Sequence, residues 1–205
     1  MIIFNNEKEY PYFCKLSKFA VRNYYNDTNY YHTIHHIYDM LMMCRKDEEY
    51  IKSIVDIDSF ITAILFHDAV YKTANKDNEL SSAKFFERVY NVCVKANEIE
   101  ENDNKKQLIY NLILSTKFGS NLITEAEKLL HDYDYFGLSN IHTMKIADKQ
   151  IVNEAMRDGY SFVQVLNGRI EFYQYLLKNG NIFVTDKYKH LNEITINNIK
   201  ENIVQ

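Results

Sequence analysis

Residues 58–73, DSFITAILFHDAVYKT, contain the sequence feature that most constrains the fold. Nearly every residue from Phe60 to Phe66 is apolar, so a helix formed here has no polar face and must be buried among other elements. The run ends in His67 and Asp68. An ionised carboxylate in such surroundings is costly unless it is hydrogen-bonded, paired or bound to a metal. The chain must therefore enclose this helix and also compensate the charge of Asp68.

Helical spacing of apolar residues continues along most of the chain. It is seen in residues 13–20, 34–41, 108–112, 162–170 and 196–203. No stretch alternates with a period of two for long enough to predict a convincing strand, and residues 179–188 are expected to form a loop with two or three extended residues. One Pro and five Gly are too few for a turn-rich sandwich or barrel. We predict an all-α fold with more than about half of the residues in helices.

The chain is predicted to be a single domain covering residues 1–205. Its 46% hydrophobic content excludes a disordered chain, and no repeat, low-complexity tract or Pro/Gly/Ser-rich linker divides it. Residues 96–106 are expected to form a surface loop or a frayed helix end. Residues 124–127, TEAE, have the spacing of a capping box and predict a helix start.

Charge and composition narrow the range of partners. The net charge is −4 and Lys105–Lys106 is the only basic pair of note, which argues against a polymeric nucleic acid as partner but not against small anions. No run of about 18 apolar residues or signal peptide is present, so no membrane partner is predicted. Three widely spaced cysteines, Cys14, Cys44 and Cys93, are typical of buried reduced thiols. We predict a cytoplasmic protein, and the sequence does not fix its oligomeric state.

Histidines and carboxylates elsewhere in the chain can compensate Asp68. His32 and His36 lie four residues apart on one helical face, with His35 on an adjoining face, and Asp132 and Asp134 follow an apolar helix. A His, a His-Asp pair and a later Asp from separate helices form a nitrogen and oxygen ligand set for a divalent metal.

Two alternatives to this metal site remain open at the level of sequence. His32-x-x-x-His36 could be half of a zinc site, although no H-E-x-x-H glutamate and no cysteine pair completes one. His67 could instead donate to a backbone carbonyl while Asp68 caps a neighbouring helix.

The order His36, His67–Asp68, Asp132 resembles the H…HD…D signature of the HD-domain metal-dependent phosphohydrolase superfamily. More closely, six blocks in order resemble the predicted HD-superfamily phosphohydrolases of this length, from about residue 30 to the C-terminus. The blocks are YYHTIHHI, ILFHDAVY, DNELSSA, LILSTKF, LLHDYDYFG and IFVTDKYKHLNEITINNI.

This resemblance implies an HD-domain helical bundle whose metal lies between helices. The implied ligands of one divalent ion, which could be Mn, Ni, Co, Fe, Mg or Zn, are His36, His67, Asp68 and Asp132. Asp134 is the rival for the last place, because the family block reads Asp-x-Asp; Asp132 is preferred.

The resemblance also implies roles for other side chains and an activity. Asp68, Glu79 and Lys117 are expected to take part in catalysis, with Glu79 orienting the attacking water and Lys117 contacting phosphate. His32, Lys72 and Asp134 are expected near the substrate. For His32 the alternative is a core histidine, and for Glu79 and Lys117 it is a solvated side chain. The expected reaction is hydrolysis of a small phosphate ester, with a nucleotide as the preferred substrate class, by metal-activated water.

Two positions depart from the family pattern. Phe118 stands where a histidine often follows the lysine, which makes a second metal less expected, and Asn29 stands where an arginine often precedes the Tyr-His pair. Both changes weaken the grip on phosphate. The alternative functions are therefore a non-catalytic, metal-containing nucleotide-binding or sensor protein and a helical scaffold with a structural metal.

Overall fold

The computed structural model describes residues 4–25 and 29–204. Of these residues 71% are helical and none forms a strand, which confirms the all-α prediction. Two of the three cysteines, Cys44 and Cys93, are buried as expected, whereas Cys14 is half-buried; all three are free thiols. Within the described chain, no helix combines the length and the apolar character needed to cross a membrane.

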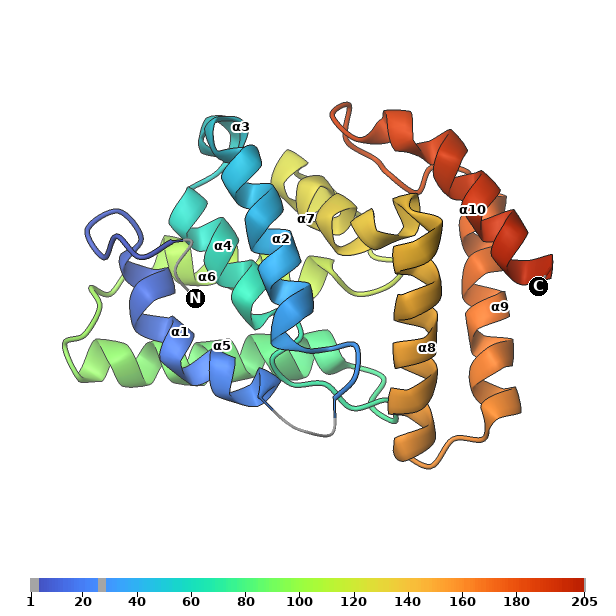
Figure 1. Ribbon diagram of the computed structural model, residues 1–205. Coiled ribbons are helices and arrows are strands. Elements are labelled where there is room, and N and C mark those ends of the chain that lie inside the picture. Colours follow the sequence, from blue (N-terminus) through green and yellow to red (C-terminus); the bar gives the residue numbers. More distant parts are fainter. Residues whose placement is uncertain (1–3, 26–28, 205) are drawn as a thin grey trace. The chain divides into compact units, whose positions relative to one another are not determined.

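The helices follow one another along the chain and are joined by short turns and by longer loops (Figure 1). They are α1 (Pro11–Tyr24), α2 (Ile34–Lys46), α3 (Glu48–Ile54), α4 (Ile57–Phe66), α5 (Asn78–Lys95), α6 (Asp103–Ser115), α7 (Glu125–Tyr135), α8 (Ile141–Arg157), α9 (Phe162–Asn179) and α10 (Asn192–Val204), with short 3₁₀ turns η1 (Phe136–Ser139) and η2 (Lys189–Leu191).

The described chain forms two compact units. The first contains residues 4–25 and 32–130, and the second contains residues 29–31 and 131–204. The border falls inside α7, which is one continuous helix. The prediction of a single domain over residues 1–205 stays a prediction, because a domain is defined by cooperative unfolding as well as by contacts.

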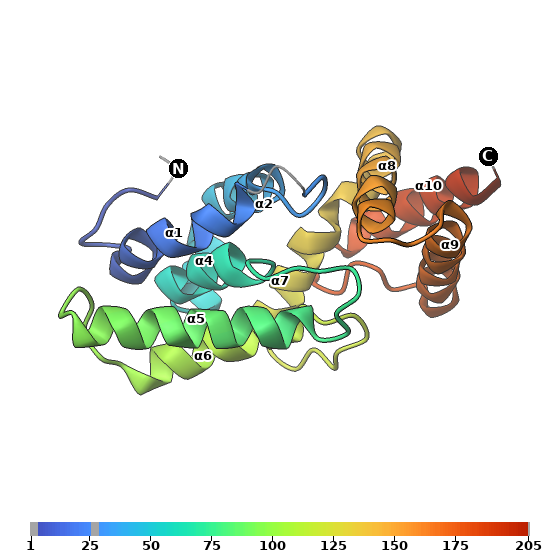
Figure 2. The same cartoon turned by 90° about the horizontal axis from the view of Figure 1, so that it is seen from below.

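Helix α4 is the core of the first unit. All ten of its residues, from Ile57 to Phe66, are buried, and it packs against α1, α2, α3, α5 and α6. Figure 2 shows α4 between α1 and α5. The apolar stretch of the sequence is therefore the central helix of this unit, and its last turn delivers His67 and Asp68 to the end of the core.

A buried carboxylate at the start of α4 caps the start of α1. Asp58 is 2% exposed, and its two carboxylate oxygens accept hydrogen bonds from the backbone amides of Tyr12 (3.0 Å) and Phe13 (2.9 Å). Pro11 has no amide hydrogen and begins the helix. Asp58 thus satisfies amides that the helix itself leaves without partners and joins α1 to α4.

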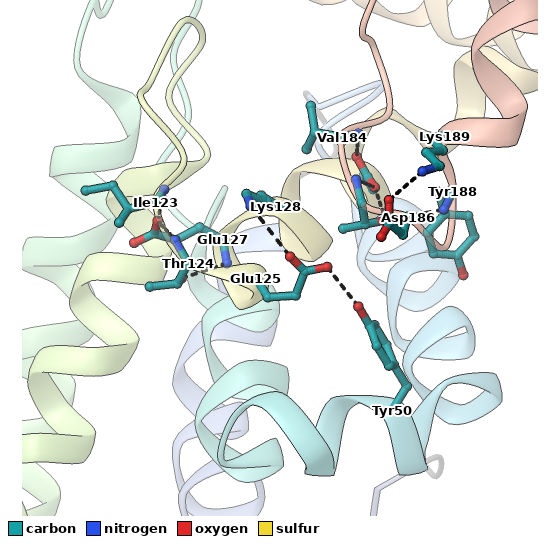
Figure 3. A network of polar contacts seen from close by, with 12 residues as sticks. Tyr50, Ile123, Thr124, Glu125, Glu127, Lys128, Val184, Asp186, Tyr188 and Lys189 are labelled. Carbon is teal, nitrogen blue, oxygen red and sulfur yellow. Dashed lines mark hydrogen bonds and ion pairs between the residues drawn. The ribbon is translucent and has the colours of Figure 1, made fainter.

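The predicted capping box at residues 124–127 is present at the start of α7 (Figure 3). The Glu127 carboxylate accepts hydrogen bonds from the amides of Ile123 and Thr124, and the Thr124 hydroxyl accepts one from the Glu127 amide. Tyr50 of α3 donates to Glu125 at 2.9 Å. These bonds fix the beginning of α7 within the first unit.

The second unit packs α8, α9 and α10 together. Its apolar core includes Met144, Tyr173 and Ile199. Asp148 of α8 lies among polar partners from the other two helices: it accepts hydrogen bonds from the Tyr173 hydroxyl (2.7 Å), from Arg169 Nε (2.9 Å) and from Asn202 Nδ2 (2.6 Å). This carboxylate ties the three helices together at one point.

Candidate metal centre

Two of the predicted ligands lie on neighbouring helices of the first unit. His36 is in the first turn of α2, and His67 caps the C-terminal end of α4, where it is 1% exposed. The centroids of the two imidazole rings are 5.5 Å apart, and the rings meet edge to face. The contact between α2 and α4 therefore brings together two histidines that are far apart in sequence.

The carboxylate of Asp68 lies against both rings. Its Oδ2 atom is 2.9 Å from His67 Nε2 and 4.0 Å from His36 Nε2. His67 Nδ1 is 2.8 Å from the carbonyl oxygen of Ile64. A carbonyl only accepts, so Nδ1 donates its proton to Ile64, and Nε2 is the ring nitrogen that faces the carboxylate. A cation or a proton placed between Nε2 and the carboxylate oxygen would be attracted by both atoms. The hydrogen bond from Nδ1 to the Ile64 carbonyl fixes the orientation of the ring, and histidines that bind metals commonly make such a bond.

The charge of Asp68 is maintained by its surroundings. Burial raises the pKa of its carboxyl group, but the attraction of His67, His32 and His36 outweighs burial and brings the pKa well below its usual range. The site therefore combines an ionised carboxylate with imidazole nitrogens, a donor set that suits a divalent transition metal.

The fourth predicted ligand, Asp132, is engaged in other bonds. It is fully buried on α7, and its oxygens accept hydrogen bonds from the amides of Val184 (2.8 Å) and Thr185 (2.9 Å) and from the Thr185 hydroxyl. Burial raises the pKa of Asp132, against the opposing effect of these bonds. Both carboxylate oxygens therefore accept hydrogen bonds within the second unit, and the role of Asp132 as a ligand stays a prediction.

His36 and His67 of the first unit belong to a group of side chains that could hold a metal ion. Asp134, the rival carboxylate, belongs like Asp132 to the second unit, and the choice between these two carboxylates stays a prediction. Asp134 is in the last turn of α7, where the negative end of the helix dipole disfavours a carboxylate and favours a nearby cation.

Glu79 interacts electrostatically with Asp68, Asp77 and Lys117. Burial raises the pKa of Glu79, and the negative charges of Asp68 and Asp77 raise it further, while Lys117 lowers it. Lys117 makes an ion pair with Asp77, the residue before α5. Glu79 thus lies in the electrostatic field of both the proposed ligand Asp68 and the cation Lys117.

The remaining predicted residues surround the loop that follows Asp68. His32 is buried and stacks on Tyr71, with ring centroids 3.3 Å apart and an angle of 17° between the planes. Lys72 is exposed, and its backbone amide and carbonyl are both hydrogen-bonded by the side chain of Asn78. Asn78 therefore fixes the path of the loop while leaving the Lys72 ammonium group in solvent.

Comparisons with models of protein families, with curated proteins and with solved structures find no match to this chain. The resemblance to HD-domain phosphohydrolases stays an expectation. The function is therefore argued from the residues of the site alone.

Sequence reasoning missed the partners of two residues that it had singled out, Lys117 and Asn29. It did not identify Asp77 as the partner of Lys117. It also missed Arg157 of α8, which donates to Asn29 Oδ1 at 3.1 Å, although Asn29 was noted as the position where an arginine is often found. Neither pairing joins residues close enough in sequence for local spacing to predict it.

Proposed function

We propose that this protein is a metal-dependent phosphohydrolase acting on a small phosphate ester, with a nucleotide as the favoured class. The observation that carries the proposal is the meeting of His36 and His67 at one carboxylate oxygen of Asp68. Three donor groups at the end of a buried helix are costly to assemble without a cation to share. The electrostatic interaction of Glu79 with Asp68 and Lys117 supports hydrolysis rather than a purely structural metal.

The residues present fit a divalent ion. His36, His67 and Asp68 of the first unit would hold it, and their imidazole and carboxylate donors suit Mn, Fe, Co, Ni, Zn or Mg. When bound, such an ion lowers the pKa of a coordinated water and polarises a phosphoryl oxygen.

Other side chains near the site are proposed to accept a proton and to bind the phosphate. Glu79 accepts the proton of the attacking water, and its raised pKa makes it a stronger base than an ordinary glutamate once ionised. Lys117 and Lys72 offset the negative charge of the phosphate. His32, held flat against Tyr71, presents an imidazole nitrogen near Asp68. Local positive charge of this kind lets a chain with a net charge of −4 bind a small anion.

Replacing Glu79 with Gln tests this assignment. Release of inorganic phosphate from nucleoside monophosphates and p-nitrophenyl phosphate is measured with Mn²⁺, Co²⁺, Ni²⁺ or Mg²⁺. We expect kcat to fall by about 100-fold or more, because the amide cannot accept the proton. Mn²⁺ affinity should change little, because Glu79 is not a ligand in this proposal.

The control is Glu87→Gln, which makes the same chemical change elsewhere on α5, where Glu87 pairs with Lys106, and it should hydrolyse like the wild type. Unchanged turnover in Glu79→Gln would exclude Glu79 as the base. Absence of phosphate release from every substrate with every metal would contradict hydrolysis itself.

A second candidate is a metal-containing nucleotide-binding protein without turnover. It is favoured by the ion pair between Lys117 and Asp77. The carboxylate of Asp77 offsets the positive charge of Lys117 and so weakens the attraction of Lys117 for a phosphate group. In that case a nucleotide would raise the melting temperature of the metal-loaded protein without any release of phosphate.

A further inference from the structure

The loop that follows Asp68 is held by side chains of neighbouring helices. Helix α4 ends at Phe66, so this loop, and not the helix itself, presents the carboxylate of Asp68. The Ala69 amide donates to the Phe66 carbonyl at 3.1 Å, and the Ala69 carbonyl accepts a hydrogen bond from Asn23 Nδ2 of α1 at 2.8 Å. Backbone groups in such a loop need partners when they are buried, and the partners of residues 70–72 come from α5.

Ser82 of α5 binds both backbone groups of Val70. Its side chain is fully buried. Its hydroxyl oxygen accepts a hydrogen bond from the Val70 amide at 3.1 Å, and its hydroxyl donates to the Val70 carbonyl at 3.3 Å. Because α5 packs against α4 (Figure 2), these two bonds tie the loop to the same helical core from which it emerges.

Asn78, one helical turn before Ser82, binds Lys72 in a similar way. Its Oδ1 atom accepts a hydrogen bond from the Lys72 amide at 3.0 Å, and its Nδ2 atom donates to the carbonyls of Lys72 (3.1 Å) and Asn75 (3.2 Å). Side chains four residues apart lie on one face of a helix. A single face of α5 therefore holds alternate residues of the loop.

Tyr71 lies between the two residues that α5 holds. Since Val70 and Lys72 are each bound at both the amide and the carbonyl, the backbone of Tyr71 is fixed between them, and its ring stacks on His32. The positive charge of a protonated His32 attracts the carboxylate of Asp68. The bonds from α5 therefore support the centre at Asp68 and also at His32, and all these residues belong to the first unit.

We infer that Ser82 and Asn78 are positioning residues for the proposed metal centre: by binding the backbone of Val70 and Lys72 they fix the loop that presents Asp68. This inference rests on the proposed function, because it takes Asp68 as a ligand. Groups that orient metal ligands typically change metal affinity by about 10- to 100-fold when they are replaced.

The test is a titration of the full chain with Co²⁺, followed by its visible absorption, which reports the donor set around the ion. Ser82→Ala should lower Co²⁺ affinity by about 10-fold and leave the saturated spectrum like that of the wild type, because the ligands are unchanged. Asn78→Ala should act in the same direction. In the metal-free proteins, amide hydrogen exchange should become faster at Val70 in the first variant and at Lys72 in the second.

The matched control for Ser82→Ala is Ser59→Ala. Ser59 is also fully buried in the first unit, but it lies in the first turn of α4, where its hydroxyl donates to Asp56 Oδ2 at 2.6 Å. Ser59→Ala removes a buried serine hydroxyl in the same way, so it should lower the melting temperature and leave Co²⁺ affinity unchanged. Asn91→Ala, at an exposed position of α5, is the control for Asn78→Ala and should bind Co²⁺ like the wild type.

Three results would overturn the inference while leaving the metal centre intact. Wild-type Co²⁺ affinity in both Ser82→Ala and Asn78→Ala would show that these bonds do not position Asp68. An equal loss of affinity in Ser59→Ala and Ser82→Ala would show that general stability, and not the loop, sets the affinity. An altered saturated spectrum in Ser82→Ala would show that the donor set itself had changed.

A wild-type protein that binds no Co²⁺ would instead contradict the proposed function, and the inference with it. If Asn78→Ala fails to fold, the pair Ser82→Ala and Ser59→Ala decides the question.

Discussion

Replacing Asp68 with Asn is expected to abolish phosphate release and to lower metal affinity by at least about 100-fold, because the change removes the charge between His36 and His67 while keeping the shape. Mn²⁺ should raise the melting temperature of the wild type but not that of the variant. Chelator should remove this gain from the wild type.

Asp39→Asn is the matched control, because Asp39 is an exposed carboxylate on α2 in the same unit. It should gain as much stability from Mn²⁺ as the wild type. An equal gain in Asp68→Asn would remove Asp68 from the set of ligands.

Replacing Asp58 with Ala is expected to destabilise the first unit by about 3 kcal/mol, because the amides of Tyr12 and Phe13 would be left buried without an acceptor. For a chain of this length, that loss lowers the melting temperature by roughly 10 °C. Asp58→Asn keeps one acceptor oxygen and should lose less, about 1 kcal/mol. Thermal unfolding followed by circular dichroism measures both changes.

The exposed residue Asp39 again supplies the control, and Asp39→Ala should unfold within about 0.5 kcal/mol of the wild type. If Asp58→Ala were as stable as that control, the capping of α1 by α4 would contribute nothing. Metal affinity gives an independent check, since Asp58 touches none of the proposed ligands and its replacement should leave Mn²⁺ binding of the folded protein unchanged.

The helical class of the fold could be predicted because its signal is local. A run that is apolar on every face, such as residues 60–66, can only be a central helix, and α4 is fully buried. The capping box at Thr124 and Glu127 depends on residues three apart, and it is present. The apolar pattern of α9 was less reliable: Val165 is buried, but Phe162 is 53% exposed, because periodicity does not show how far a neighbouring helix extends.

The candidate site could be predicted only in part. The motif located His36, His67 and Asp68, whose close approach follows from the packing of α2 on α4. The hydrogen-bond partners of Asp132 depend on which side of α7 faces the segment 182–185. That segment lies about fifty residues later in the chain, and its binding to Asp132 is a tertiary contact with no local sequence signal.

Long-range polar pairs were beyond sequence reasoning for the same reason. Two contacts of this kind join residues about forty or more positions apart in the sequence: the hydrogen bond from the Tyr12 amide to Asp58 and the ion pair between Lys117 and Asp77. A buried carboxylate in the sequence indicates that some partner must exist, but only the packing of helices determines whether that partner is an amide, a cation or a metal. Three buried aspartates show the difference. Backbone amides are the partners of Asp58 and Asp132, whereas the carboxylate of Asp68 lies beside two histidines.

The metal content of the purified protein tests the central claim most directly. The wild type and His36→Ala are prepared without chelator, equilibrated with Mn²⁺, passed through metal-free buffer and measured by elemental analysis. The account predicts about one ion per chain in the wild type and almost none in His36→Ala, because the variant lacks one of the two imidazoles that face Asp68. A wild type without bound metal, or a variant that retains as much as the wild type, would contradict it.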